Sequence, residues 1–305
     1  MLDWMAENRR LLLRVVGTLL AIGLIFALMR EEGWSEVVAA FKQISLTQIA
    51  AALVLVMFSR LCVTARWYIL LRSGGVKTSA GQAAALTFTG LFANNFLPTT
   101  IGGDVVRLAG AMQLGYDRAI SLASLAADRL IGMLGMIFTL PLGLVPAINS
   151  LGHGVGQALA FSGLISRASD FVRRTVQTFS VWFSRPLALL GALVCTWGHM
   201  LFTFLTMYIL IGALGGHVGF WMIAGLWSLA YFVTLVPISI NGYGVQELSL
   251  TFLFSTVGGL STAASLTVAV LIRALYIGVS LVGAFFLPGI LSSVRKPQPT
   301  APADT

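Results

Sequence analysis

Residues 94–107 read NNFLPTTIGGDVVR and separate two apolar runs, at about 83–96 and 105–114. A transmembrane helix needs about 20 consecutive apolar residues, so neither run crosses a bilayer alone. The stretch combines a helix-stopping proline, two hydroxyls, two glycines, an acid and a base. A hydrocarbon environment tolerates such groups only where they line a protein-enclosed or watery site. We therefore predict that residues 94–107, the first tip, join a broken, re-entrant helix pair and form half of a binding site.

The composition indicates that the environment is a membrane. Of the 305 residues, 57% are hydrophobic and only 10% are charged, whereas soluble domains carry about 25% charged residues. We predict an all-α fold, a polytopic transmembrane helical bundle, with one domain at 1–292 and a disordered cytoplasmic tail at 293–305. The net charge of +8 is expected to reflect basic cytoplasmic loops rather than binding of nucleic acid.

The apolar pattern predicts several membrane spans and four shorter segments. Full spans are expected at about 11–29, 46–71, 120–140, 186–211 and 263–287, with a weaker one at 142–165. The shorter apolar segments are 83–96, 105–114, 220–236 and a run that ends at Val257. Amphipathic segments are expected at 34–43 and 167–185.

Basic residues indicate the orientation. If the N-terminus is inside and the shorter segments form hairpins, the cytoplasmic bases are Arg9, Arg10, Arg14, Arg72, Lys77, Arg118, Arg167, Arg173, Arg174, Arg185, Arg295 and Lys296. Only Arg30 and Lys42 then lie outside. Cytoplasmic loops of membrane proteins carry this excess of Lys and Arg. We therefore expect a multi-pass protein of the inner membrane with both termini in the cytoplasm.

A second stretch, residues 237–247 (PISINGYGVQE), matches the first tip and is called the second tip. Residues 98–103 and 237–242 share the pattern P-x-[ST]-I-x-G, and the spacing from 98 to 237 equals that from 103 to 242. The charge pattern places the first hairpin on the cytoplasmic side and the second on the outer side. Paired interrupted segments of opposite sidedness are typical of an inverted-topology repeat with a site near the midplane. The alternative is that proline and glycine only kink two helices.

The residue types at the tips predict an anion site. We expect Thr100 to cap the outgoing half-helix, and Gly102 and Gly103 to let the backbone approach a ligand. The freed N–H groups and the helix dipole then favour an anion. The second tip repeats this pattern with Ser239, Asn241 and Gly242.

Charges inside the apolar segments support the same interpretation. A charged side chain at the bilayer centre costs about 2.5–3.5 kcal/mol on insertion scales, so such residues are functional candidates. The bases are Arg60, Arg66, Arg107, Arg129 and Arg273, and the acids are Asp104, Asp128 and Glu247. If every acid pairs with an arginine, two arginines remain. That surplus suits phosphate, which the planar guanidinium binds through two hydrogen bonds.

Several of these residues have structural alternatives. Arg66 and Arg107 lie near predicted span ends, where they can snorkel to the interface. Asp128 and Arg129 can form a structural pair, and Asp104 can cap its helix. Aromatic residues near span ends are expected to be interface anchors, namely Trp67, Tyr68, Trp221 and Tyr231.

Motifs for other chemistries are missing from the sequence. His153, His199 and His217 lack metal-ligand spacing, so we expect no metal site and no cofactor. Hydrolase, protease and nucleotide-binding motifs do not occur either, so we expect that the protein is not an enzyme.

The two tips, the Asp128-Arg129 pair between them and Arg273 after them resemble the lysylphosphatidylglycerol synthase membrane-domain family, also described as flippase-like integral membrane proteins. The resemblance extends from Arg60 to about Leu287. It implies a lipid-translocating domain of the bacterial inner membrane. The chain looks like a stand-alone member, without the soluble domain that synthesises the aminoacylated lipid.

We therefore expect a lipid transporter, or flippase, for an anionic lipid that bears phosphate, either a phospholipid or a polyprenyl-phosphate lipid. The predicted substrate site comprises Arg60, Asn95, Pro98, Thr100, Gly102, Gly103, Asp104, Arg107, Asp128, Arg129, Pro237, Ser239, Asn241, Gly242, Glu247 and Arg273. The alternatives are an intramembrane transferase acting on a lipid-linked phosphate and a transporter of a small soluble anion. The expected partners are the lipid and the membrane, with no nucleic acid. The sequence is also compatible with an oligomer.

Overall fold

The computed structural model describes residues 9–32, 34–97, 101–151, 185–236 and 239–294. This part of the chain is helical, as the composition predicts. Its elements are α2 (Arg9–Glu32), α3 (Trp34–Gln43), α4 (Leu46–Ser73), α5 (Ala80–Asn94), α6 (Gly102–Gln113), α7 (Arg118–Leu151), α11 (Pro186–Ala213), α12 (Phe220–Thr234), η1 (Ile240–Gly242), α13 (Val245–Thr256), α14 (Thr262–Ser280) and α15 (Val282–Val294).

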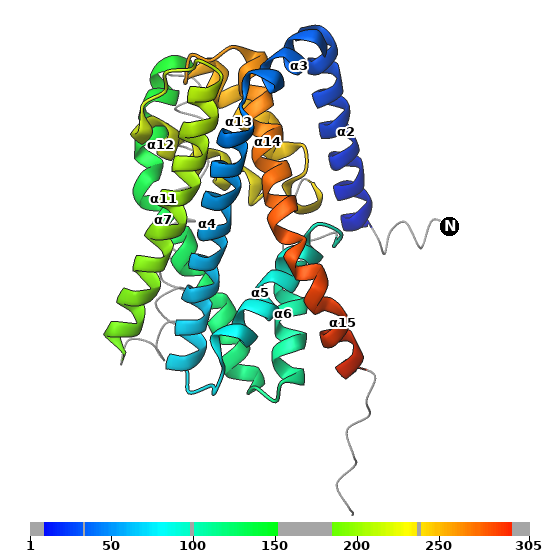
Figure 1. The fold of residues 1–305 in the computed structure, drawn as a ribbon, viewed down its shortest axis with the longest axis vertical. Helices are drawn as coiled ribbons and strands as arrows, with labels where there is room; N and C mark the ends of the chain where they lie inside the picture. Colours follow the sequence, from blue (N-terminus) through cyan, green and yellow to red (C-terminus); the bar gives the residue numbers. More distant parts are fainter. Residues whose placement is uncertain (1–8, 33, 98–100, 152–184, 237–238, 295–305) are drawn as a thin grey trace, which may run out of the picture.

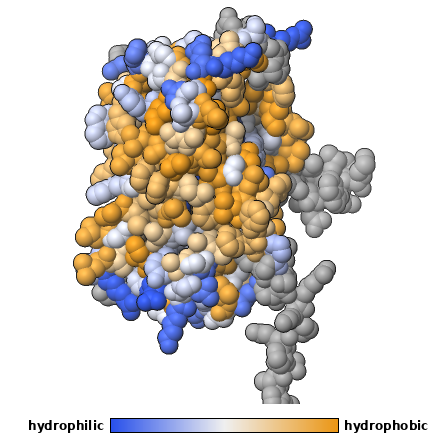
Figure 2. All heavy atoms as spheres, in the orientation of Figure 1, coloured by the Kyte–Doolittle hydropathy of each residue, from blue (hydrophilic) through white to orange (hydrophobic). Residues whose placement is uncertain are grey.

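The long helices have the length and composition of membrane spans. Four apolar helical stretches in the described part are long enough to cross a bilayer: Leu46–Ser73, Arg118–Ser150, Pro186–Ala213 and Thr262–Pro288. Helix α2 adds a shorter apolar stretch, Val15–Ala27. Figure 2 shows a broad apolar band around the middle of the molecule, with hydrophilic residues gathered at both ends. These are the features of a multi-pass membrane protein.

One long segment differs from the sequence prediction. Helix α7 continues through Pro141 and Pro146 to Leu151, so 142–151 belongs to the third span and the predicted separate span at 142–165 is wrong at its start. A transmembrane helix tolerates proline because neighbouring groups satisfy the freed carbonyl. The remainder, 152–165, lies outside the described residues, as do 166–184 and the tail from residue 295. The last predicted span, 263–287, is confirmed as the apolar helical stretch Thr262–Pro288, in which α14 is followed by α15 after Leu281.

The helices repeat in order and in length. Helices α4, α5 and α6 contain 28, 15 and 12 residues, and α11, α12 and α13 contain 28, 15 and 12. A long apolar helix follows each set. The short helices are about 18 to 23 Å long at 1.5 Å per residue, less than the ~30 Å of hydrocarbon in a bilayer. In Figure 1, α5 and α6 lie in the lower half of the bundle, whereas α12 and α13 lie in the upper half.

The first set of helices, α4–α7, and the second set, α11–α15, each pack on a short helix of the other set. Helices α4 and α11 pack along one another, and α7 packs on α12, where Gly143 meets Gly225 so closely that an added Cβ would overlap the backbone. In the same way, Gly283 of α15 packs on the backbone of Phe88 in α5. Gly143 and Gly283 occupy nearly equivalent places in the two sets of helices, so this close contact is repeated. It brings α12 close to α7 and α5 close to α15.

Candidate functional site

A cavity of about 330 Å³ lies where the two tips meet. Residues from both tips line it, together with side chains of α4, α7, α11, α12 and α14. The tips also touch directly, because the hydroxyl of Tyr243 donates a hydrogen bond to Oδ1 of Asn95 at 3.3 Å. The two matching stretches that the sequence singles out therefore contribute to one cavity, although they are far apart in the chain.

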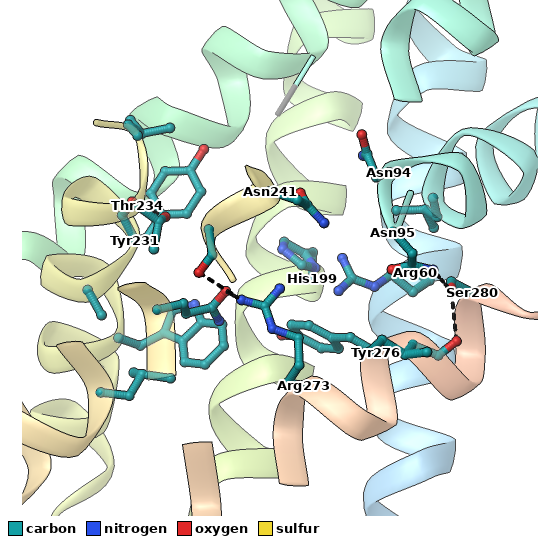
Figure 3. A pocket seen from close by; sticks show the side chains of 18 of the residues that line it. Arg60, Asn94, Asn95, His199, Tyr231, Thr234, Asn241, Arg273, Tyr276 and Ser280 are labelled. Atoms are coloured by element: carbon teal, nitrogen blue, oxygen red, sulfur yellow. Dashed lines mark hydrogen bonds between the residues drawn. The ribbon is translucent and has the colours of Figure 1, made fainter. Parts of the chain in front are cut away.

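Arg60 is the cavity cation without a carboxylate partner in the described part of the chain. Its guanidinium lies over the ring of Tyr276, 4.0 Å from the ring centre. His199 of α11 lines the cavity beside it, and its Nδ1 forms a hydrogen bond with the hydroxyl of Ser59 at 2.6 Å. Figure 3 shows the side chains of Arg60, His199 and Asn241 near one another at the centre of the cavity. This cluster combines polar groups from three different parts of the fold.

Two further arginines line the cavity, and each is held by an acid. Arg129 of α7 donates through Nε to Asp104, and Arg273 of α14 donates through Nε to Glu247. Asp104 and Glu247 occupy the same place, the third residue of α6 and of α13. Arg273 also donates to the amide oxygen of Gln246 at 2.9 Å. Each second short helix is thus tied by an ion pair to the long helix that follows it.

The remaining charges form a buried network beside the cavity. Nε of Arg66 lies 2.6 Å from Oδ1 of Asp128, and Nη1 of Arg107 lies 3.2 Å from both Asp128 and Asp104. Arg66 and Arg107 are only 6% exposed, so the snorkelling alternative is wrong for both. Asp128 pairs with Arg66 and Arg107, and Arg129 pairs with Asp104, so the predicted Asp128–Arg129 pair is also wrong.

The glycines of the first tip make close packing contacts. A Cβ on Gly102 would collide with Leu97, and one on Gly103 would collide with the Gly90 carbonyl. The N–H of Gly103 donates to Oδ1 of Asn94 at 2.6 Å. Gly103 therefore allows close contact between α5 and α6, and Gly102 allows close contact with Leu97. The expected approach to a ligand is not the role that this geometry gives them. The N-cap position is occupied by Ile101, which makes no side-chain cap.

The second tip reverses through left-handed backbone positions. Asn241 has φ 48° and ψ 26°, and Gly242 and Gly244 have φ of 73° and 78°. Asparagine and glycine adopt this conformation at low cost. The N–H of Ile240 donates to Oγ1 of Thr18 at 2.7 Å, and the N–H of Gly244 donates to Glu247 at 2.7 Å. The turn thereby places Asn241 and Gly242 in the cavity lining.

The predicted site residues fall into three groups. Those that line the cavity are Arg60, Asn95, Arg129, Asn241, Gly242 and Arg273. Those placed outside its lining are Gly102, Gly103, Asp104, Arg107, Asp128, Ser239 and Glu247. Pro98, Thr100 and Pro237 lie outside the described residues.

Sequence reasoning missed several cavity residues. The spacing from Arg60 to His199 equals that from position 98 to position 237, so the repeat is a signal that could have found His199. Tyr231 lines the cavity instead of anchoring the membrane interface. Trp67 is also not an interface anchor, because it is fully buried against Arg107, whose guanidinium lies 4.1 Å from its ring centre. Tyr276 carried no sequence signal, because a tyrosine within an apolar run is most often a core residue.

The network predicts a large loss of stability when Asp128 is neutralised. Asp128→Asn leaves Arg66 and Arg107 without their shared counter-charge, and breaking a buried pair in this way costs about 3–5 kcal/mol. We expect a clearly lower melting temperature of the detergent-solubilised protein, measured by differential scanning fluorimetry. The matched control is Lys77→Gln, which removes an exposed charge and should leave the melting temperature unchanged. Equal melting temperatures for both variants would contradict a structural role for the network.

Comparison with known protein families identifies the family of the chain. A model of the family "Lysylphosphatidylglycerol synthase TM region" matches residues 14–168 and 156–283. Together these matches cover most of the chain, and they include both tips, the cavity and the arginines that line it. A comparison with curated proteins found no match. On the strength of the family match, the chain belongs to the lysylphosphatidylglycerol synthase TM region family.

Proposed function

We propose that the protein is a lipid transporter, a flippase that moves an anionic, phosphate-bearing lipid across the bacterial inner membrane. The observation that carries the proposal is Arg60, a cation in the cavity lining that no carboxylate of the described chain neutralises. A charge in a low-dielectric site needs a counter-charge. A phosphate would supply it, and the guanidinium fork is suited to phosphate oxygens.

The charge on the ligand would be bound by side chains rather than by helix ends. The N–H of Gly103 is taken by Asn94, and the N–H of Gly244 is taken by Glu247. Asp104 and Glu247 also place a negative charge in the first turn of each short helix. A phosphate at either helix end would meet a carboxylate, whereas Arg60 is available to bind it.

In this proposal the two short pairs are re-entrant and form an inverted repeat. Helices α5 and α6 enter from the cytoplasmic side and α12 and α13 from the outer side. Their lengths support this, as does their position in opposite halves of the bundle. The basic residues flanking α5 and α6, which are Arg72, Lys77 and Arg118, favour the cytoplasm for that end. Arg185 at the start of α11 lies there too, since it donates to the carbonyl of Ser73.

Transport would follow from movement of one half against the other. The headgroup occupies the cavity between the tips while its acyl chains stay in the bilayer. Arg129 and Arg273 can turn from Asp104 and Glu247 towards a bound phosphate, which would loosen the ion pair on one side. Alternating release of the two symmetric pairs would expose the cavity first to one face and then to the other.

A transferase is less well supported than a transporter. That reaction requires a carboxylate that is available as a base or metal ligand. Asp104, Asp128 and Glu247 each accept hydrogen bonds from arginine in the described structure, and none of them lines the cavity. The acids therefore fit a role in positioning arginines better than a role in proton abstraction.

The Arg60→Gln variant tests the proposal directly. In reconstituted vesicles, we expect the wild type to move tail-labelled phosphatidylglycerol between leaflets. The movement is measured by quenching the label in the outer leaflet. Hydrogen bonds to charged groups contribute about 1.5–3 kcal/mol, so the variant should be slower by roughly tenfold or more.

The control for this experiment is Arg118→Gln, which removes the same charge from an exposed position and should retain the wild-type rate. An Arg60→Gln protein as fast as the wild type would contradict the site. Uptake of inorganic phosphate by vesicles in which no lipid moves would contradict lipid transport and favour a soluble anion.

The re-entrant arrangement predicts the sidedness of four positions in loops or at helix ends. In a variant without the native cysteines, single cysteines replace Lys77, Arg118, His217 or Ser261. We expect a membrane-impermeant maleimide to label the first two from the cytoplasmic face and the last two from the outer face. Labelling of positions 77 and 118 from opposite faces would mean that the first short pair crosses the membrane, and this would refute the repeat.

A further inference from the structure

The cavity lining also indicates the chemistry of the headgroup. We infer that the site selects a lipid whose phosphate carries a neutral, hydroxyl-bearing group, such as a polyol, and that it rejects a cationic aminoacyl headgroup. The inference rests on the proposed transport function and narrows its substrate class. It differs from what the family description, which refers to the lysyl lipid, would suggest.

The charges around the cavity disfavour a cation. Arg60, Arg129 and Arg273 line it, and no carboxylate is among the described lining residues. The nearest acids, Asp104 and Glu247, are already bound to arginine. An ammonium group in this cavity would therefore face the guanidinium of Arg60, which no described carboxylate neutralises, and would find no free carboxylate of its own. Like charges placed side by side in a binding site are unfavourable.

The neutral polar groups indicate a partner that donates hydrogen bonds as well as accepting them. Asn241 and Tyr231 line the cavity, and neither side chain forms a hydrogen bond with another residue of the described structure. An amide and a phenol each both donate and accept, whereas phosphate oxygens only accept. Hydroxyl groups on the headgroup would use the amide oxygen and the phenol oxygen, which a bare phosphate would leave unpaired. Figure 3 shows Asn241 between Tyr231 and Arg60, so both parts of such a headgroup have partners within one cavity.

The cavity walls suit a small polyol. The rings of Trp227 and Tyr276 meet edge to face with their centres 6.2 Å apart, and both line the cavity. Aromatic side chains offer an apolar face together with a polar tip, and a glycerol or cyclitol likewise presents C–H faces and hydroxyl edges. A volume of about 330 Å³ lies at the small end of ligand pockets, which span roughly 300–1,000 Å³. It favours a compact headgroup.

A comparison of four tail-labelled lipids tests this inference with the wild-type protein in vesicles. The lipids are phosphatidylglycerol, phosphatidylinositol, phosphatidic acid and lysyl-phosphatidylglycerol. We expect the two polyol lipids to move fastest. Phosphatidic acid should be slower by about three- to tenfold, the effect of a lost neutral hydrogen bond, and the lysyl lipid should be slower by at least about tenfold. If the lysyl lipid moves as fast as phosphatidylglycerol, the inference is overturned while transport stands. If none of the four lipids moves, the proposed function itself is contradicted.

Two conservative variants test whether Asn241 and Tyr231 recognise the headgroup. Asn241→Gly removes the amide but keeps a residue that tolerates the left-handed backbone at this position, where φ is 48°. Tyr231→Phe removes only a hydroxyl. We expect the ratio of the phosphatidylglycerol rate to the phosphatidic acid rate to fall by about three- to tenfold in each variant.

The matched control is Tyr208→Phe, because Tyr208 is 51% exposed and lies outside the cavity lining. Its rate ratio should equal that of the wild type. A uniform decrease for both lipids in the Asn241→Gly and Tyr231→Phe proteins would show a structural role for these residues and would overturn the inference, as would an unchanged ratio.

Discussion

Two ion pairs, Asp104 with Arg129 and Glu247 with Arg273, connect each tip to the long helix that follows it. A charge inside a membrane protein is stable only with a partner, so each pair fixes the position of both its residues. The carboxylates sit in the first turn of α6 and α13, and the arginines face the cavity. Because both pairs are satisfied internally, the positive charge left in the cavity is that of Arg60. The proposed selectivity for an anion depends on this distribution.

The irregular backbone at the tips is stable for a related reason. Backbone N–H groups inside a membrane protein need partners, and side chains provide them at three positions of the tips. Asn94 binds the N–H of Gly103, Thr18 binds that of Ile240 and Glu247 binds that of Gly244. The glycine contacts of α7 on α12 and of α15 on α5 then pack one helix of each short pair closely on the other set of helices. Hydrogen bonds to the backbone and close helix packing thus both stabilise the surroundings of the cavity.

Much of the fold could be predicted from local features. The length of the apolar runs and the breaks at the two tips predict the long helices, the short pairs and the spacing between them. The continuation of α7 through Pro141 could not be predicted in this way, because neighbouring helices determine whether proline ends a transmembrane helix. The sequence also could not predict which acid pairs with which arginine. Asp128 faces Arg66 and Arg107 rather than its neighbour Arg129, and this choice depends on how α4, α6 and α7 pack. His199 and Tyr231 looked like ordinary core or interface residues until the fold placed them in the cavity.

Native mass spectrometry of the purified protein can show directly whether the two tips form a site for an anionic headgroup at Arg60. The wild type and the Arg60→Gln variant are released from detergent under the same conditions, and the retained lipid is identified by fragmentation. We expect the wild type to retain a phosphate-bearing anionic lipid and the variant to lose it while keeping its folded charge-state distribution. Equal retention of that lipid by both proteins, or retention only of zwitterionic or cationic lipid by the wild type, would contradict an anion site at Arg60.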